Sequence, residues 1–353
     1  MACALRLAAR GQWTARPNPA VGCVIAHGEE VVGEGWHRRA GEAHAEPLAL
    51  QAAGERARGA TAYVTLEPCA HHGRTPPCAE ALLAAGIARV VSALHDPFEH
   101  VNGRGLARLR EGGVQVDTGL LEAAAREINR GFLSRVHRGR PWLRVKLAMS
   151  LDGRTALAGG ESRWISSAAS RRDVARWRAR CGALLTTDVT VRADDPMLTV
   201  RLDEPAEFAP PLRVVLAADL GIPAGARILD ASAPTLLVHA GGAAVPAHLS
   251  GCERIALDAR GDRVDPAAAV AALAQRGINE VQVEAGATLC GALLEAGLVD
   301  ELLVYVAPVV LGERARPLLG GLDVGTMAQR RGFSLVQSRR VGPDLRLLYR
   351  PEA

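Results

Sequence analysis

Apolar residues follow two kinds of pattern along this chain, short β-branched runs and longer segments rich in alanine and leucine. The short runs are typical of strands, and the longer segments are typical of helices, since their apolar residues recur every three or four positions. An opening hairpin is expected to turn at Gly28, and helices and strands then alternate. The predicted strands are 21–26, 31–36, 61–66, 89–94 and 114–117, and the predicted helices are 2–10, 48–57, 76–86, 106–111 and 122–136.

The alternation resumes after residues 137–141, a short basic stretch with glycine and proline that we interpret as a linker. A chain of 353 residues exceeds the size at which one hydrophobic core usually keeps growing. We therefore expect two α/β domains, residues 1–138 and 142–353, with ligands at the carboxyl ends of parallel strands. The second domain is predicted to contain strands 142–149, 184–187, 212–216, 235–239, 254–257, 280–284 and 301–311, helices 169–180, 266–276 and 287–295, and a closing antiparallel pair, 333–340 with 345–350.

The most informative motif is His44-Ala45-Glu46, which is followed by Pro68-Cys69 and then by Cys78. One imidazole and two thiolates give a zinc ion three protein ligands and leave its fourth tetrahedral position for water. Bound zinc lowers the pKa of water from about 15.7 towards about 7, and a nearby carboxylate then carries the proton. This order of residues is typical of zinc-dependent nucleobase deaminases, in which the glutamate is not a ligand.

The motif sets a geometric condition on the backbone. Residues two apart on a regular helix point away from each other, so His44 and Glu46 must lie at the start of a helix. Pro47 supports this interpretation, because proline is tolerated in a first helical turn.

Other interpretations of these residues stay open at this point. His71 or His72 could close the site as a fourth ligand, Cys69 and Cys78 could be core thiols without a metal, and His44 could be an ordinary hydrogen-bonded histidine. The cysteines also have eight residues between them, where the usual motif has two.

The composition narrows the function classes. With 48% hydrophobic and 23% charged residues the chain is globular, and no apolar run reaches membrane-spanning length. The N-terminus lacks a secretory pattern and the seven cysteines are scattered, so we expect a cytoplasmic protein with no membrane partner. A net charge of +4 and 3% aromatic residues argue against a nucleic-acid binder and suit a small phosphorylated substrate better.

The second half contains no established nucleotide motif. No G-x-G-x-x-G fingerprint occurs, and residues 286–291 have the spacing of a phosphate loop without its Lys-Ser/Thr. Residues 283–289 pass from a strand through glycine into a helix, whose free N–H groups suit a phosphate, but a tight turn without a ligand fits equally well. Taken alone, Asp194-Asp195-Pro196 and Arg201 are typical of a turn and a solvated charge.

Together, the motifs of the two halves resemble the bifunctional deaminase-reductase family of riboflavin biosynthesis, over essentially the whole chain. The resemblance rests on residues 44–46, 65–78, 146–154, 164–165, 193–196 and 284–286, and it includes the cysteine spacing. It implies an N-terminal cytidine-deaminase-like α/β/α sandwich and a C-terminal α/β domain like dihydrofolate reductase.

The resemblance implies two successive reactions, with Zn²⁺ and NADPH as cofactors. The first domain would deaminate 2,5-diamino-6-(5-phosphoribosylamino)pyrimidin-4(3H)-one by hydrolysis, and the second would reduce the ribosyl side chain to give 5-amino-6-(5-phosphoribitylamino)uracil. A homo-oligomer, dimer or tetramer, is also implied. The alternatives are a zinc deaminase that acts on a nucleic-acid base, with the second half as a binding module, and a zinc-stabilised scaffold without activity.

Site residues are carried over by motif. The resemblance makes His44, Cys69 and Cys78 the zinc ligands and Glu46 the proton shuttle. It places NADPH at Ala148, Trp164, Thr190, Asp194, Gly286, Ala287, Thr288, Leu289, Cys290, Gly291 and Ala292. It places the substrate at Ser162, Arg178, Leu198, Arg201 and Glu284, with Lys146 as a further candidate for orienting the sugar. Arginine suits this role because its planar guanidinium matches a phosphate.

Two positions depart from the family pattern. Phe98-Glu99 stands where Asn-Pro is common, which removes an expected polar contact to the first substrate. Ala217-Ala218 stands where Asp-Ser is usual, which removes a hydroxyl near the expected cofactor.

Overall fold

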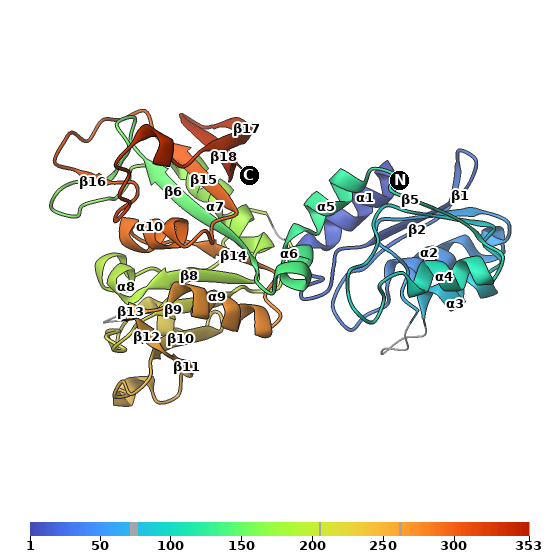
Figure 1. Cartoon of the computed structure of the whole chain (residues 1–353), viewed down its shortest axis with the longest axis horizontal. Coiled ribbons are helices and arrows are strands. Elements are labelled where there is room, and N and C mark those ends of the chain that lie inside the picture. The colour runs from blue at the N-terminus through green and yellow to red at the C-terminus, as the bar shows by residue number, and fades with distance from the viewer. Residues whose placement is uncertain (71–76, 205, 261–262, 353) are drawn as a thin grey trace. The chain divides into compact units, whose positions relative to one another are not determined.

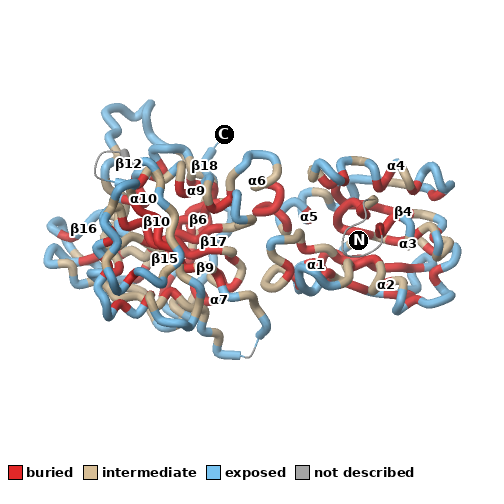
Figure 2. Tube along the Cα trace, turned by 90° about the horizontal axis from the view of Figure 1, so that it is seen from below, coloured by how far each residue is buried: buried red, intermediate tan, exposed pale blue. Residues whose placement is uncertain are grey.

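The computed structural model describes residues 1–70, 77–204, 206–260 and 263–352. The chain forms two compact units, Met1–Gly139 and Arg140–Ala353, each with its own central sheet (Figure 1). Buried residues follow the central strands of both units, as the red segments in Figure 2 show. Among the described residues, no helix is both long and apolar enough to span a bilayer.

The first unit is a five-stranded sheet covered by helices. Its strands are β1 (Gly22–His27), β2 (Glu30–Trp36), β3 (Thr61–Val64), β4 (Arg89–Ser92) and β5 (Gln115–Thr118). Its helices are α1 (Ala2–Arg10), α2 (Ala45–Ala53), α3 (Cys78–Ala84), α4 (Arg104–Glu111), α5 (Glu122–Ile128) and α6 (Arg130–Arg138). The strand order is β2-β1-β3-β4-β5, in which β1 is antiparallel to β2 and β3 while β3, β4 and β5 are parallel. The predicted hairpin at Gly28 is confirmed.

Two glycines let helices approach this sheet closely. A Cβ at Gly22 would meet the backbone of Ala4 in α1, and a Cβ at Gly35 would meet the backbone of Ala45 in α2. Gly22 pairs with Trp36, and Gly35 pairs with Cys23. Because Gly22 and Cys23 are consecutive residues of β1, side chains at Gly22 and Gly35 would point to opposite faces of the sheet. The absence of a side chain at Gly35 therefore fixes the start of α2 close to the end of β2.

The predicted helix 122–136 is two helices, α5 and α6, and the prediction of one continuous helix was wrong. The chain bends at Asn129, between them. The buried Asn129 side chain accepts a hydrogen bond from Ala20 N (2.8 Å) and donates one to Ala20 O (2.9 Å). This contact joins residues far apart in the sequence, so the local pattern contained no sign of it. Because α6 continues to Arg138, the linker is also shorter than predicted.

The second unit has a nine-stranded sheet. Its strands are β6 (Trp142–Met149), β8 (Ala183–Thr187), β9 (Leu212–Leu216), β10 (Thr235–Ala240), β11 (Glu253–Leu257), β14 (Glu280–Val283), β15 (Glu301–Val306), β17 (Phe333–Val341) and β18 (Asp344–Pro351). Their order is β11-β10-β9-β8-β14-β6-β15-β18-β17. Neighbours from β11 to β15 are parallel, and β18 is antiparallel to both β15 and β17. The predicted closing pair is confirmed.

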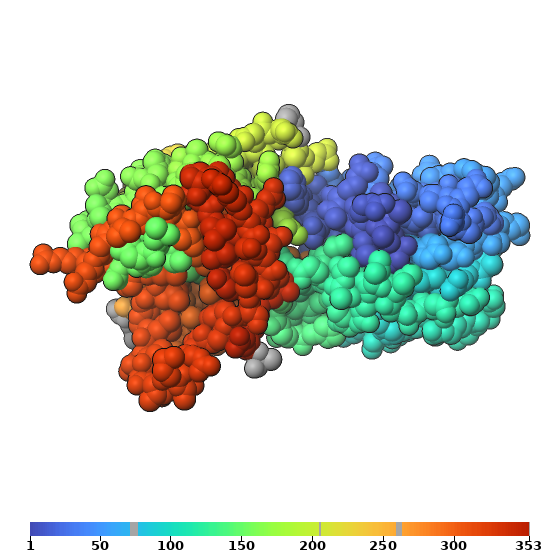
Figure 3. All heavy atoms as spheres, turned by 90° about the horizontal axis from the view of Figure 1, so that it is seen from above, coloured from blue at the N-terminus to red at the C-terminus, as the bar shows by residue number. Residues whose placement is uncertain are grey.

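Helices and short strands complete the second unit. The helices are α7 (Ala168–Arg180), α8 (Asp188–Asp194), α9 (Pro266–Gln275) and α10 (Ala287–Glu295). Outside the main sheet, β7 (Arg154–Ala156) pairs with β16 (Arg316–Pro317), and β12 (Ala259–Arg260) pairs with β13 (Arg263–Val264). The edge strand β17 is exposed along most of its length, and this red end of the chain lies on the face of the second unit drawn in Figure 3.

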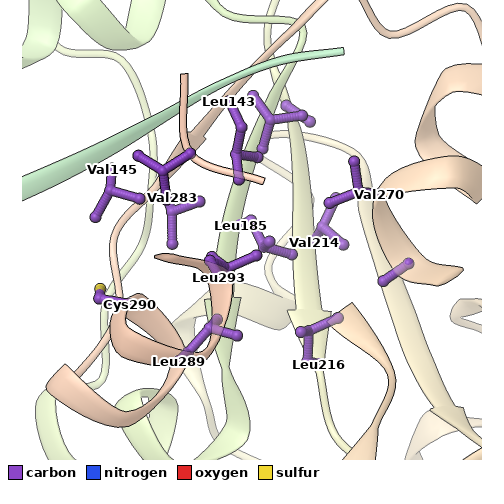
Figure 4. Packing of buried hydrophobic residues seen from close by; sticks show 14 of the residues in the cluster. Leu143, Val145, Leu185, Val214, Leu216, Val270, Val283, Leu289, Cys290 and Leu293 are labelled. Carbon is purple, nitrogen blue, oxygen red and sulfur yellow. The ribbon is translucent and has the colours of Figure 1, made fainter. Parts of the chain in front are cut away.

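Alternation along β6 places its apolar and its charged side chains on opposite faces of this sheet. Leu143 and Val145 pack with residues of neighbouring strands and of α9 and α10 (Figure 4). The intervening Arg144 and Lys146 point to the opposite face, where the Arg144 guanidinium lies 4.5 Å from the ring centre of Trp177 in α7. The charged side chains of β6 therefore lie on the α7 side of the sheet.

Two local predictions in this unit were wrong. The predicted strand 301–311 ends at Val306, because Pro308 has no N–H for a ladder and Val309 N turns back to bond Ala307 O (2.8 Å). The sequence reading also missed α8, a seven-residue helix that begins where the Thr187 side chain accepts a hydrogen bond from Thr190 N.

Candidate active sites

The first candidate site begins at the N-terminus of α2. His44 is the residue that caps this helix, with extended backbone (φ −71°, ψ 172°), and Glu46 lies in the first turn. The expected placement at a helix start is therefore confirmed, and it lets both side chains face the same region. The ring of His37 packs edge-on against that of His44, with 5.3 Å between centroids, and is held by Asn18 Nδ2 (3.0 Å). Sequence reasoning did not single out His37.

Two sulfurs complete the cluster from other elements. Cys69 follows the end of β3, and Cys78 is the first residue of α3. His44 Nδ1 lies 3.3 Å from Cys78 Sγ and 3.7 Å from Cys69 Sγ, and Cys78 N donates to Cys69 Sγ (3.4 Å). The structure thus brings together three residues that are up to 34 positions apart in the chain.

The donor set fits a zinc ion. The ligating atoms of His44, Cys69 and Cys78 lie within 4.8 Å of one another. Tetrahedral zinc with bonds of about 2.0–2.3 Å places such atoms roughly 3.3–3.8 Å apart. Hydrogen bonds from Cys78 and His44 lower the pKa of Cys69 to about 4, whereas its hydrogen bond to Cys69 and burial raise the pKa of Cys78, so without a metal Cys69 is the thiolate of the pair. The cluster needs only small adjustments to hold the ion.

Glu46 is the nearby carboxylate. It is buried, and its Oε2 makes no hydrogen bond to any residue that the structure describes. Burial raises the pKa of Glu46 to about 7. A carboxyl group near neutrality with a free oxygen is suited to accept and return a proton. His71 and His72, the candidates for a fourth ligand, lie outside the described residues.

Glu67 is a residue of this site that sequence reasoning missed. Its side chain is fully buried, and its two oxygens accept hydrogen bonds from four backbone N–H groups. The donors belong to Asp96, Gly103, Gly105 and Leu106. Its position in Glu67-Pro68-Cys69 was the only local signal, and its partners were not visible in the sequence.

The second candidate site is centred on Glu284, directly after β14. Arg178 of α7 donates through Nε and Nη2 to the two carboxylate oxygens of Glu284, each at 2.7 Å, and through Nη1 to Thr199 O (2.9 Å). Lys146 is near enough for Glu284 to raise and Arg178 to lower its pKa, but burial has the largest effect and the pKa is lowered. Gln282 Nε2 also donates to Glu284 (2.9 Å). The structure thus brings Lys146, Arg178 and Glu284 together, and Arg178 is already engaged by protein groups.

Trp164, in the loop before α7, lies close to the end of α8 in the second unit. Trp164 is 69% exposed, and the guanidinium groups of Arg171 and Arg163 lie 4.4 and 5.8 Å from its ring. Arg163 donates to the carbonyl oxygen of Asp194, the last residue of α8. This contact brings the predicted cofactor residues Trp164 and Asp194 to one place.

The remaining predicted residues differ in their surroundings. Thr190 lies in the first turn of α8 and its Oγ1 is 3.1 Å from that of Thr187. Leu198 is buried with φ 48°, and Ala148 packs beside the apolar cluster that includes Trp177. Ser162 is half-buried and Arg201 is exposed, and among the described residues no contact ties Arg201 to the Glu284 group.

The segment from Gly286 to Ala292 forms the start of α10. Gly286 caps the helix and has open space where a Cβ would lie. A Cβ at Gly291 would meet Gly320 O, and Gly320 N donates to Ala287 O (3.0 Å), so a second loop packs along α10. Free N–H groups of a first helical turn bind phosphates well, and this N-terminus therefore fits the pyrophosphate of NADPH.

Comparisons with known proteins agree with both halves. A model of the RibD C-terminal domain matches residues 141–347, and a model of the cytidine and deoxycytidylate deaminase zinc-binding region matches residues 1–94. Riboflavin biosynthesis protein RibD of Escherichia coli (strain K12) is 48% identical, over 98% of this chain and 96% of its own, and that of Haemophilus influenzae is 44% identical, over 99% and 96%.

Solved structures give the same result for the fold. Form 1 of Acinetobacter baumannii RibD superposes with a TM-score of 0.92 at 42% identity, covering 100% of this chain and 98% of its own. A deaminase/reductase from Thermotoga maritima superposes with a TM-score of 0.89 at 30% identity, covering 100% and 97%. The chain has a cytidine-deaminase-like domain followed by a RibD reductase domain, and it belongs to the RibD family of bifunctional, zinc- and NADPH-dependent deaminase-reductases of riboflavin biosynthesis.

Proposed function

We propose that residues 1–138 hydrolyse the 2-amino group of 2,5-diamino-6-(5-phosphoribosylamino)pyrimidin-4(3H)-one. We propose that residues 142–353 then reduce the ribosyl group with NADPH to give 5-amino-6-(5-phosphoribitylamino)uracil. The observation that carries the first step is the convergence of an imidazole and two thiols beside a buried carboxylate with a free oxygen. The product of the first reaction is the substrate of the second, which explains why one chain carries both sites.

In the deaminase, His44, Cys69 and Cys78 would hold Zn²⁺, which when bound would supply an activated water. Glu46 would hold a proton at its free Oε2 and return it to the leaving amine, so that overall one water is consumed and one ammonia is released. Burial raises the pKa of Glu46 above its ordinary value, which favours a group that can accept a proton and return it.

In the reductase, the cofactor supplies the hydride and the protein orients the reacting groups. Ala148, Trp164, Thr190, Asp194 and the start of α10 would hold NADPH, and the free N–H groups of the first turn of α10 would suit its pyrophosphate. Glu284 is held in one orientation by Arg178 and would accept a hydrogen bond from the substrate, and Ser162 and Leu198 would make further substrate contacts. Lys146 orients the sugar, and Arg201, which is exposed, is the guanidinium better placed than Arg178 to meet the phosphate.

The same proposal covers partners and location. The substrate is a small phosphorylated pyrimidine in the cytoplasm, and no nucleic acid is involved, in keeping with the low aromatic content. The protein works as a homo-oligomer, dimer or tetramer, as its family membership suggests. Sedimentation velocity tests this last part, and a monomer at working concentration contradicts it.

Product analysis tests the proposed function directly. The purified chain is incubated with the diaminopyrimidine ribotide, with and without NADPH. Ammonia and the deaminated ribosyl product are expected without NADPH, and the ribityl product with it. A parallel incubation with tRNA is expected to release no ammonia. Release from tRNA but not from the ribotide contradicts the proposal.

A further inference from the structure

We propose that Glu67 is a positioning residue of the deaminase site, which fixes the loop 95–103 and α4 against the thiol cluster of Cys69 and Cys78. The proposal rests on the assignment of these two cysteines as zinc ligands. It adds a residue whose two carboxylate oxygens accept hydrogen bonds from the backbone and which the sequence motif did not assign to the metal.

The first observation is how the Glu67 carboxylate divides its hydrogen bonds. Oε1 accepts from Gly105 N (3.0 Å) and Leu106 N (3.3 Å), both in the first turn of α4. Oε2 accepts from Asp96 N (3.1 Å) and Gly103 N (3.1 Å), at the two ends of the loop, and lies 3.4 Å from Nδ1 of His95. One oxygen therefore holds the helix and the other holds the loop.

The second observation is that both partners meet the thiol cluster. A Cβ at Gly105 would overlap Pro68 O, so α4 begins in direct contact with the residue before Cys69. Within the loop, Val101 is buried with Cys69 and Cys78 in one cluster, and Phe98 packs against it. The carboxylate that precedes the Pro68-Cys69 pair thus also places the apolar wall beside the sulfurs.

The third observation is that a carboxylate is needed here rather than any polar group. Four backbone donors converge on two oxygens, and only an ionised carboxylate offers acceptor sites on both sides. A glutamine would keep one oxygen and turn an NH₂ group towards the other two donors. The N-terminus of α4 also favours a negative charge. Either the helix or the loop would lose its anchor in that variant.

Displacement of this wall is expected to affect the metal before it affects the fold. Groups that orient metal ligands from outside typically change metal affinity or activity by about 10–100-fold when they are replaced. We therefore expect Glu67→Gln to weaken zinc binding and to lower deaminase kcat/KM, each by at least about tenfold. Glu67→Asp keeps both oxygens on a shorter side chain and is expected to fall between wild type and Glu67→Gln.

The experiment compares four full-length variants with the wild type. Glu67→Gln and Glu67→Asp are tested beside Leu109→Ala, which removes a buried side chain from the same helix without touching the carboxylate, and beside Cys69→Ser. Zinc affinity is measured by competition with a chromophoric chelator, deaminase kcat and KM by ammonia release, and unfolding by thermal denaturation. Reductase activity on the deaminated substrate reports whether Arg140–Ala353 is folded, and thermal denaturation reports whether Met1–Gly139 is folded.

The outcomes separate the proposal from its premise. The expected result is weakened zinc binding in the order wild type, Glu67→Asp, Glu67→Gln, with reductase activity kept and with Leu109→Ala close to wild type in zinc affinity. Wild-type zinc affinity and deaminase kinetics in Glu67→Gln overturn the proposal. The proposal is also overturned if the loss of zinc affinity, relative to the loss of stability, is the same in Leu109→Ala as in Glu67→Gln. Full zinc binding by Cys69→Ser overturns the ligand assignment instead.

Discussion

Glu46 shows how the position of one residue sets its chemistry. Burial raises its pKa to about 7, and one of its oxygens has no partner among the described residues. A buried carboxyl group with one oxygen left without a partner is unfavourable for the fold, so its presence beside three side chains that could hold a metal indicates use in the reaction. The role of Glu46 in proton transfer depends on its charge and its free oxygen rather than on the size of its side chain.

We expect Glu46→Gln to lower deaminase kcat by at least about 100-fold, because proton transfer by a positioned side chain contributes about 10²–10⁴-fold. Zinc content should stay at one ion per chain, since the amide leaves His44, Cys69 and Cys78 in place. Reductase activity on supplied deaminated substrate should be unchanged. Ammonia release, metal analysis and NADPH oxidation measure the three properties. Loss of zinc in this variant would make Glu46 a ligand and contradict its role.

The residue scale also shows where sequence reasoning stops. The convergence of His44, Cys69 and Cys78 was predictable because zinc chemistry allows few side chains and the local order of the motif is distinctive. Glu67 lies inside the same motif, but its role depends on N–H groups from residues 96–106, which a linear pattern does not connect to it. The sequence thus indicates the side chains that react, but it does not indicate the backbone N–H groups that hold neighbouring side chains in place.

At the scale of elements, β2 and α2 position the catalytic residues through one glycine. A Cβ at Gly35 would meet backbone atoms of Ala45 and Ala49, which cannot move without the helix. We expect Gly35→Ala to lower the free energy of unfolding by about 1–3 kcal/mol, as for overpacked cores, and to weaken zinc binding by moving His44. Urea unfolding and chelator competition measure the two effects.

Glu34→Ala is the matched control for this variant. Glu34 is the preceding residue of β2, is exposed, and alternation along the strand points its side chain away from α2. Its replacement should leave zinc affinity unchanged and stability within about 0.5 kcal/mol of wild type. Equal zinc affinity in Gly35→Ala and Glu34→Ala would contradict the coupling between β2 and the metal ligands.

The ends of elements were harder to predict than their existence, for identifiable reasons. The pattern placed most strands of both sheets, because buried β-branched runs are unambiguous at their centres. It missed the break at Asn129, where a side chain bonds the backbone of Ala20, and it extended a strand past Pro308 into Val309 and Val310, which are exposed. In each case a long-range contact or a missing N–H outweighed local propensity.

The ion pair that joins α7 to the end of β14 gives a pH dependence of stability. Burial alone would raise the pKa of Glu284, but Arg178, Lys146 and Gln282 together lower it to about 2 from an ordinary 4.5. A carboxyl group with a lowered folded pKa stabilises the fold above its unfolded pKa, and this contribution is lost as the pH falls from about 4.5 towards 2. The full contribution corresponds to roughly 3 kcal/mol.

We therefore expect the difference in free energy of unfolding between wild type and Glu284→Gln to be constant from pH 7 to about pH 5 and to shrink at lower pH. Urea unfolding followed by tryptophan fluorescence at pH 7, 5, 4 and 3 measures this difference. The comparison with the variant removes the effect of all other titrating groups. A difference that grows as the pH falls would contradict the lowered pKa of Glu284.

At the scale of the whole molecule, each unit contains its own core and its own set of site residues. The zinc cluster and Glu46 lie within Met1–Gly139, and Lys146, Arg178 and Glu284 lie within Arg140–Ala353. Among the described residues, each set is drawn from one unit alone. Damage to one site should therefore leave the second reaction intact, provided that the deaminated intermediate can leave the first site and reach a second chain.

Mixing two inactive variants tests this independence. Glu46→Gln is expected to lack deaminase activity, and Glu284→Ala is expected to lack reductase activity. Neither variant alone should therefore convert the diaminopyrimidine ribotide to the ribityl product. Because the complementary sites are intact, an equimolar mixture with NADPH should form that product after a lag in which the intermediate accumulates. The lag should shorten as the Glu46→Gln chain is added in excess, since it consumes the intermediate. A mixture that releases ammonia but forms no ribityl product, although each remaining activity is normal, would show that the intermediate is not exchanged between chains.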